Sequence, residues 1–597
     1  MLIRKRSVWL LAMAAAGMVS VHAHATENTV AVTKAATAKA KSDPLYRYQW
    51  HLSNQGQKVF ADTRPVPGVD LDIGTLHDAK VRGTGVIVAV VDDGLEIRHP
   101  DLLDNVVIGG SKNFVDGSND PTPTNPNSEH GTSVAGIIAE VGWNGVGGRG
   151  VAPEAKLKGF NFLSSDADGI ETDQDTNIRY SWGNGPEARD AQVFNNSWGI
   201  STSSFPAVNV AETKSWEKLM SSTRNGKGGV YLKAAGNNFS ALIVSFLGFR
   251  FNLCAADSLT INVGCSLANT DPTNNYITTT VVAAVNADGI RSSYSSPGSA
   301  VWVSGIGGEY GFQKKYYPDL TNIGDWAKAT FYQPAIVTTD LTGCAAGSNA
   351  DRANGEVDNA LDTSQSTIDK TCNYWAGMNG TSAATPTVAG VTALVLGVNP
   401  KLSARDVKYI LATTARQIDP LQPKAVYKGA VQDPGWITNA AGHHFSNWYG
   451  FGLADASAAV EKARNFKSLP ALQDSGWLAT ADKPVAIEGI GSQNSKLTVA
   501  VTKRMKVEAV QFGFTTTHKT PRNLRAILTS PSGTKSYVLP AFTTLSATSG
   551  GFAVDLSSSN AFLDEPALGT WTLQLLDMND SSGSAQLQAF NLRVVGH

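Results

Sequence analysis

One apolar run that ends in two carboxylates constrains the fold more than any other feature. Residues 86–91 read VIVAVV, which is apolar at every position and rich in β-branched side chains. A strand without polar alternation is typical of a parallel sheet that is covered on both faces. The run stops at Asp92-Asp93-Gly94. Because functional groups in open α/β sheets lie at the carboxyl ends of the strands, Asp92 is the first candidate for a functional side chain.

The rest of the chain divides into two regions of different pattern. Up to about Phe466, strand-like and helical runs alternate, which predicts an α/β fold with a mostly parallel sheet. The predicted strands cover 191–194, 229–235 and 279–285, and the predicted helices cover 133–141, 383–398 and 403–415. Beyond Phe466, short strand-like runs are separated by turn signals, which predicts a β-sandwich or jelly roll. These runs cover 496–502, 507–515, 524–529, 536–539, 570–576 and 585–595.

Composition indicates a folded chain and argues against one class of partner. Of 597 residues, 42% are hydrophobic and 17% are charged, which favours a packed core over disorder. The 49 Lys and Arg residues nearly balance the 51 Asp and Glu residues, so the net charge is −2. Binding to phosphates needs a basic surface, and we therefore expect no nucleic-acid partner.

The N-terminal segment predicts export. Arg4, Lys5 and Arg6 precede an apolar run over 8–21, and residues 23–25 (AHA) offer a cleavage site. This pattern is that of a Sec signal peptide, and the run is short for a transmembrane span. An uncleaved membrane anchor is the alternative. We expect a secreted or periplasmic protein with no membrane span in the mature chain.

Four cysteines fit an oxidising compartment. Cys254, Cys265, Cys344 and Cys372 are an even number in a chain that is expected to be exported. Four cysteines allow three pairings, and sequence alone does not choose among them. We favour Cys254–Cys265 and Cys344–Cys372, because each pair lies in one loop-like stretch. A zinc site is not expected, because no C-x-x-C spacing occurs.

Three short motifs together predict nucleophilic catalysis. Asp92 ends the predicted strand, and His130 and Ser382 each lie at the entry to a predicted helix. A serine hydroxyl needs an imidazole to accept its proton and a carboxylate to hold that imidazole in one tautomer. Each motif alone has a structural alternative, such as a loop histidine or an aspartate in a turn. Their order and local contexts favour a catalytic triad.

These motifs resemble the catalytic blocks of the subtilisin-like serine peptidases. The matching segments read VAVVDDG, HGTSVAG and NGTSAATPTVAG. The resemblance implies that Asn237 donates a hydrogen bond to the oxyanion, although an asparagine here could also serve a turn. It also implies that Ser197, Trp198 and Gly199 form the edge along which the substrate backbone adds as a strand. A core position for Trp198 is compatible with that role.

Further segments are similar to the kexin/furin branch of that family, among them QWHL at 49–52, IVTTD at 336–340 and YGFGLADA at 449–456. The C-terminal β region looks like the P (Homo B) domain that follows the catalytic domain in this branch. The resemblance thus implies protein or peptide substrates and a subtilisin-like domain with a parallel sheet, followed by an all-β P domain. The expected divisions are a signal peptide at 1–25, a short segment at 26–42, a peptidase domain at 43–466 and a P domain at 467–597.

The resemblance also implies a bound Ca²⁺ ion. Side-chain oxygens would come from three residues and main-chain carbonyls from three more. Oxygen ligands of this kind suit Ca²⁺, whereas a glycine-rich turn with solvated carboxylates is the alternative. The implied ligands are Asp43, Asp101 and Asn144 through side chains, and Val141, Val146 and Gly148 through carbonyls.

Specificity for Lys or Arg is a further implication, with departures from the family pattern. Asp93 matches an acidic residue that faces a basic substrate side chain, and Asp271 is a candidate second acid. The branch has acidic residues after its Ser-Trp-Gly segment, but residues 200–204 read ISTSS. A second calcium site near the pocket also lacks its acid, because residues 291–294 read RSSY. A strict dibasic requirement is therefore not expected.

Only residues 26–42 separate the expected cleavage site from Asp43, where family members usually carry a chaperone-like prodomain. Either folding needs no such domain, or a chaperone or inhibitor acts in trans, since folds with many long-range contacts fold slowly. We expect a secreted, calcium-dependent serine endopeptidase. The alternatives are a broad-specificity subtilase without basic preference, and a catalytically silent binding protein on the same scaffold.

Overall fold

The apolar run becomes β1 (Ile87–Val91), which lies inside a six-stranded sheet. The computed structural model describes residues 42–164, 174–200, 202–246, 249–350, 357–363, 366–579 and 583–597, so the expected signal peptide lies outside the described residues. Every strand pair in this sheet is parallel, and the strand order is β2-β1-β3-β4-β7-β8. The expected parallel α/β fold is confirmed.

The other strands of this sheet are β2 (Lys156–Phe160), β3 (Val193–Asn196), β4 (Val230–Ala234), β7 (Thr279–Val285) and β8 (Val301–Ile306). The longer helices are α1 (His130–Ala139), α3 (Val210–Gly226), α7 (Thr381–Val398), α8 (Ala404–Thr414) and α9 (Ala456–Arg464). Shorter elements are α2 (Gln174–Arg179), α4 (Ala256–Ile261), α5 (Asp325–Lys328), β5 (Ile243–Phe246), β6 (Phe249–Asn252), β9 (Ile336–Thr339), β10 (Tyr374–Met378), β11 (Ala425–Tyr427), β12 (Ala430–Asp433), β13 (Ile437–Thr438) and β14 (His444–Phe445).

The side chains of β1 alternate between two cores, which explains why no polar residue interrupts the run. Val88 and Val90 pack into one core together with residues of α1, α7, α8 and α9. Ala89 and Val91 pack into a second core together with residues of α3. Helices therefore cover both faces of the sheet, as parallel sheets require.

Helix α7 lies at the centre of the first core and contacts α1, α9 and five strands of the sheet. By length and mean hydropathy it could cross a membrane, but 83% of its apolar window is buried in the fold. Its apolar surface is therefore used for packing, as in the core helix of a globular protein.

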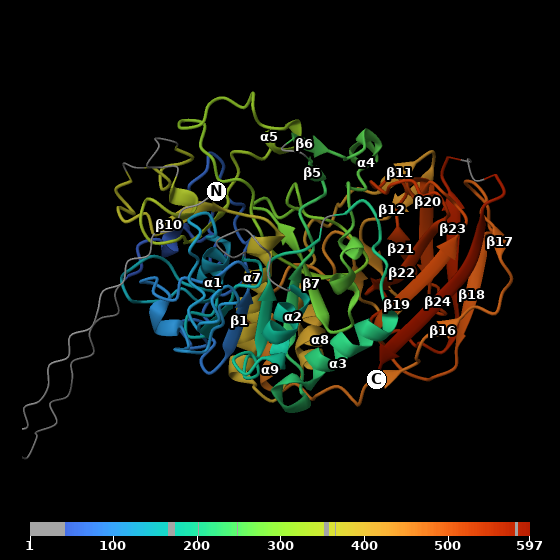
Figure 1. Ribbon diagram of the computed structural model, residues 1–597, viewed down its shortest axis with the longest axis horizontal. Coiled ribbons are helices and arrows are strands. Elements are labelled where there is room, and N and C mark those ends of the chain that lie inside the picture. Colours follow the sequence, from blue (N-terminus) through green and yellow to red (C-terminus); the bar gives the residue numbers. More distant parts are fainter. Residues whose placement is uncertain are drawn as a thin grey trace, which may run out of the picture. The chain divides into compact units, whose positions relative to one another are not determined.

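From residue 473 onward the described chain forms two antiparallel sheets and a separate apolar core, as expected for an all-β domain (Figure 1). One sheet has the order β15-β24-β19-β22, with β16 and β17 also paired to β24, and the other has the order β18-β23-β20-β21. The bounds are β15 (Gln473–Asp474), β16 (Leu478–Ala479), β17 (Val485–Ala486), β18 (Lys496–Val501), β19 (Val507–Thr516), β20 (Leu524–Thr529), β21 (Lys535–Leu539), β22 (Phe552–Ser559), β23 (Gly569–Asp577) and β24 (Gln586–Gly596).

Among the described strands of the β domain that are longer than two residues, only β22 escapes prediction from its sequence. It reads FAVDLSSS, and its serines suggest a loop rather than a strand. In the structure these serines are buried against the α/β domain, where Asn269 Nδ2 donates to Ser557 Oγ at 3.1 Å and to the Ser558 carbonyl at 3.0 Å. The polar half of β22 is thus a contact surface between the two domains.

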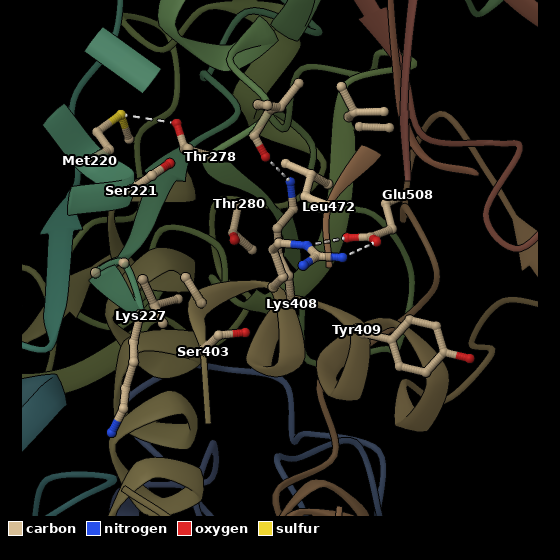
Figure 2. A pocket seen from close by; sticks show the side chains of 18 of the residues that line it. Met220, Ser221, Lys227, Thr278, Thr280, Ser403, Lys408, Tyr409, Leu472 and Glu508 are labelled. Carbon is tan, nitrogen blue, oxygen red and sulfur yellow. Dashed lines mark hydrogen bonds and ion pairs between the residues drawn. The ribbon is translucent and has the colours of Figure 1, made fainter. Parts of the chain in front are cut away.

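Charged side chains also join the two domains, and a cavity of about 300 Å³ lies on the same seam (Figure 2). Arg405 of α8 pairs there with Glu508 of β19. The buried ammonium of Lys408 donates to the carbonyls of Ile277 and Thr279 at 3.0 and 2.8 Å. Burial lowers the pKa of Lys408 to about 7. No residue of the predicted triad lines this cavity, so it is separate from the candidate active site.

Candidate active site

The fold brings the three motif residues to one edge of the sheet. Asp92 follows β1 directly, His130 is the first residue of α1, and Ser382 lies in the first turn of α7. Helices α1 and α7 pack against each other, and α1 also contacts β1. The amino ends of two helices therefore meet the carboxyl end of the strand, which is where α/β folds place their functional groups.

Asp92 holds the imidazole of His130. The distance from His130 Nδ1 to Asp92 Oδ1 is 2.7 Å, and Asp92 is fully buried. Burial by itself lowers the pKa of His130, but the adjacent Asp92 carboxylate outweighs it and raises the pKa to about 9. With Nδ1 occupied, Nε2 is the nitrogen left to exchange a proton with a nucleophile.

Asp93 lies beside this pair and binds the backbone at the start of α1. Its Oδ1 accepts a hydrogen bond from the backbone N–H of Gly131 at 2.7 Å. Burial and the charge of Asp92 raise the pKa of Asp93 to about 7. Atoms of Asp92, Asp93 and His130 that could bind a metal lie within 4.8 Å of one another. The hydrogen bond between His130 and Asp92 already accounts for this cluster.

The hydroxyl of Ser382 bonds to a partner other than the one that catalysis would require. Ser382 Oγ donates to the carbonyl of Ser197 at 2.8 Å, and Ser197 Oγ donates back to the carbonyl of Ser382 at 2.9 Å. Within the described part of the chain no hydrogen bond joins Ser382 to His130. The Ser382 hydroxyl must therefore reorient before His130 can accept its proton, and hydrogen bonds of this kind are often absent from free active sites.

Asn237 is fixed with its amide nitrogen available. It follows Gly236, whose φ of 107° turns the chain at the end of β4. The Asn237 Oδ1 atom accepts from the backbone N–H and from the hydroxyl of Thr381, each at 2.9 Å. Since the oxygen is anchored next to Ser382, Nδ2 is the group that can donate to a negative charge developing on a substrate.

A pocket of about 110 Å³ opens beside Ser382. Its lining brings together the residues that the sequence associates with substrate: Ser197, Trp198, Gly199, Asn237, Asp271 and Ser382. Asp93 is absent from this lining and lies instead beside His130. Asp271 is the single charged residue of the described lining.

Asp271 is already paired within the protein. Its Oδ2 lies 2.9 Å from Lys233 Nζ and accepts from the Ile200 N–H at 3.0 Å, and its Oδ1 accepts from the N–H and the hydroxyl of Thr273 at 2.9 and 2.7 Å. Burial opposes ionisation, but Lys233 holds the pKa of Asp271 below its usual value. Lys233 was not among the predicted site residues, although a lysine inside the apolar run VYLKA is a detectable signal.

The first predicted calcium ligand has partners of its own. Asp43 is buried, and its carboxylate accepts from the backbone N–H groups of Trp143 and Gly145 at 2.8 and 3.1 Å. It also forms an ion pair with Arg149. A cation at Asp43 would therefore compete with Arg149 for the carboxylate.

The second predicted ligand, Asp101, lies in the same loop region. Its carboxylate accepts from Asn144 Nδ2 at 2.6 Å, and its backbone carbonyl accepts from the Val141 N–H at 2.9 Å. Burial raises the pKa of Asp101 to about 7, and it strongly raises the pKa of Glu140, whose Oε1 is buried without a hydrogen-bond partner.

The rest of this loop is crowded with oxygen atoms. The N–H of Val146 donates to Asn144 Oδ1 at 2.8 Å, and a methyl group on Gly148 would come within 2.5 Å of the Glu140 carboxylate. Clustered buried carboxylates are the chemistry that a hard cation favours, so the residues present suit Ca²⁺. Glu140 was not among the predicted ligands.

The cysteines pair as favoured from their spacing. Disulfides join Cys254 to Cys265 and Cys344 to Cys372, and the described chain contains no free cysteine. Both bonds lie in the α/β domain, and they fit an oxidising compartment.

Comparison with known proteins identifies relatives over most of the chain. Residues 83–452 match the Subtilase family and residues 507–594 match the Proprotein convertase P-domain. The chain is 38% identical to the Aeromonas extracellular serine protease of Aeromonas sobria, over 92% of this chain and 86% of that protein. It is 28% identical to the dibasic-processing endoprotease of Schizosaccharomyces pombe, over 91% of this chain and 63% of that protein.

Among solved structures, the fold resembles the Aeromonas sobria serine protease in its complex with the chaperone ORF2. The TM-score is 0.81 at 35% sequence identity, and the alignment covers 93% of this chain and 95% of that one. The likeness spans both domains, which agrees with the two family matches.

Proposed function

The chain belongs to the subtilase family of serine proteases, and from that premise we propose that it is an exported, calcium-dependent endopeptidase. It uses Asp92, His130 and Ser382 for catalysis, and it prefers Lys or Arg at the cleavage site. The observation that carries the triad is the 2.7 Å contact between His130 Nδ1 and Asp92, at the edge of the sheet where α7 places Ser382. Asn237, anchored by Thr381, supplies the donor for the oxyanion.

The mechanism follows from which atoms are held and which are free. His130 Nε2 takes the proton of Ser382 as the serine oxygen bonds to the substrate carbonyl carbon, and Asp92 stabilises the resulting imidazolium. Negative charge on the substrate oxygen is met by Asn237 Nδ2 and by the positive amino end of α7. His130 then returns the proton to the leaving amine, an acyl-enzyme forms on Ser382, and water releases it by the reverse sequence.

Calcium has a structural role in this proposal. Asp43, Asp101 and Asn144 would hold it through side chains, with carbonyls of Val141, Val146 and Gly148. A divalent cation there would offset the charge of buried carboxylates that otherwise raise one another's pKa. The ion would fix the loop after α1 and thus the helix that begins at His130.

The preference for basic residues is supported by two carboxylates near the triad and by the name of one relative. Asp93 lies next to His130, and Asp271 lines the pocket beside Ser382. The Schizosaccharomyces pombe relative is named a dibasic-processing endoprotease. If the pocket lacks this preference, the enzyme is a broad-specificity subtilase.

Cleavage of a mixed peptide library tests this proposal directly. Wild type and Ser382→Ala are incubated with calcium, and the new termini are identified by mass spectrometry. We expect cleavage after Lys or Arg by wild type and none by the variant. Cleavage after large apolar residues would contradict the basic preference alone. Absence of cleavage by wild type as well as by the variant would favour a catalytically silent binding protein.

We also propose that folding is assisted in trans by a second protein. The complex of the Aeromonas sobria protease with a chaperone supports this idea. Ser382→Ala expressed with and without the genes that neighbour its own should give a higher soluble yield in the first case. Equal yields would contradict the proposal.

A further inference from the structure

A buried lysine lies directly behind the acidic residue of the substrate pocket. Lys233 belongs to β4, between β3 and β7 in the middle of the parallel sheet, and 1% of its side chain is exposed. Its ammonium pairs with Asp271, donates to the carbonyl of Trp198 and lies 4.2 Å from the centre of the Trp198 ring. A charge in the interior of such a sheet is costly unless it is paired, so the lysine and the aspartate depend on each other.

This pair adjoins the pocket wall. A methyl group placed on Gly199 would lie 3.1 Å from Asp271 Oδ2 and 3.2 Å from Lys233 Nζ. Gly199 lines the pocket that opens beside Ser382. The charges of Asp271 and Lys233 therefore lie immediately behind the surface that a substrate side chain would contact.

The carboxylate of Asp271 has little capacity left for a substrate. A carboxylate offers about four acceptor positions. Lys233 and the Ile200 N–H occupy Oδ2, while the N–H and the hydroxyl of Thr273 occupy Oδ1. A guanidinium or ammonium group entering the pocket would have to displace Lys233, or it would meet a pair whose net charge is zero.

We propose that Lys233 sets the specificity of this pocket by neutralising Asp271 from within the protein. The pocket then prefers a basic residue before the scissile bond less strongly than an unpaired Asp271 would make it, and it tolerates neutral side chains there. Asp93 contributes to the basic preference from its own subsite. This inference rests on the proposed function, because it assumes that the pocket beside Ser382 holds the residue before the scissile bond.

The test changes charge while it preserves size. Peptides identical except for Arg or citrulline before the scissile bond differ in charge but hardly in shape, and their ratio of kcat/KM isolates the electrostatic preference. Lys233→Met keeps a linear side chain but exposes the Asp271 charge to the pocket, and should raise the Arg-to-citrulline ratio at least tenfold over wild type. Lys233→Met/Asp271→Asn is neutral again and should restore the wild-type ratio.

A second comparison remains valid if Lys233→Met fails to fold with an unpaired buried carboxylate. Asp271→Asn alone leaves the ammonium of Lys233 without its counter-charge. Its Arg-to-citrulline ratio should be at least tenfold lower than that of Lys233→Met/Asp271→Asn, which differs from it only at residue 233. A merely structural role of Lys233 would change the stability of these proteins but not the ratio.

The outcomes separate the two proposals. Active variants that all share the wild-type ratio would overturn the role of Lys233 and leave the proposed peptidase function intact. Absence of any Ser382-dependent cleavage, in wild type as in the variants, would overturn the proposed function and this inference with it. A wild-type enzyme that already prefers Arg to citrulline a hundredfold, with Asp271→Asn abolishing that preference, would show that Asp271 binds substrate in spite of Lys233.

Discussion

Glu217 of α3 and Arg593 of β24 meet at 2.8 Å across the seam between the peptidase domain and the β domain, with 5% and 7% of their side chains exposed. Gln511 of β19 also donates to the Glu217 carboxylate, at 2.9 Å. The P domain therefore completes a buried charge network of the peptidase domain, and the stability of one domain depends on the other.

Arg593→Met is expected to destabilise the whole protein, because it leaves the charge of Glu217 buried without its partner. Breaking a buried ion pair typically costs about 3–5 kcal/mol, whereas an exposed pair contributes about 0–1 kcal/mol. Denaturant unfolding of the full chain measures this cost. Lys328→Ala, which removes the exposed ion pair with Asp325, is the matched control. A loss as small as that of the control would contradict the prediction.

The pH dependence of kcat/KM should reflect the raised pKa of His130. A general base acts in its neutral form, so activity should rise with pH through a limb near 9 rather than near the ordinary value of 6.5. Asp92→Asn removes the charge that raises this pKa. Its limb should move to lower pH while its maximal kcat falls roughly 10⁴-fold, as when serine peptidases lose the aspartate of the triad. A wild-type limb at or below 6.5 would contradict the prediction.

Asn237→Ala should slow the chemical step without weakening substrate binding. Loss of one oxyanion donor typically lowers kcat by about 10²–10³ and leaves KM nearly unchanged. Steady-state kinetics on a peptide substrate distinguish these parameters. Asn465→Ala, at an exposed asparagine just after α9, is the control and is expected to retain most of its activity. A fall in kcat of less than threefold for Asn237→Ala would exclude the assigned role.

Removal of calcium should lower the thermal stability of the full chain. A ligand present at 100 times its Kd stabilises the folded state by about 2.7 kcal/mol, and a chelator removes that contribution. Asp101→Asn should have a lower Tm in calcium and should respond less to the chelator, whereas Asp319→Asn, at an exposed position, should behave as wild type. Identical melting curves of wild type with and without chelator would contradict calcium binding.

Local sequence patterns were enough to propose the triad because each member lies at one end of its own element. The apolar run before Asp92, and the small residues after His130 and Ser382, specify a strand and two helices without reference to the rest of the chain. Lys233 and Asp271 lie 38 positions apart, and Asp43 and Arg149 lie 106 apart. The sequence around each residue does not show which charges pair, because the tertiary fold determines the pairing.

The missed strand β22 shows the same limit in secondary structure. Strand prediction relies on one face being apolar and the other polar, relative to one core and to solvent. The serines of β22 are buried, and Asn269 of the other domain donates to the Ser557 hydroxyl and to the Ser558 carbonyl. A polar surface buried between domains has the sequence pattern of an exposed loop.

Helix α7 carries the nucleophile in its first turn and contributes the rest of its length to the main core of the peptidase domain. The active site therefore cannot loosen while that core stays intact, nor can the core melt and leave a working serine behind. Partial heating should yield a mixture of fully active and inactive molecules instead of a uniformly weakened enzyme. Residual activity after heating would then measure the fraction of molecules that remain folded.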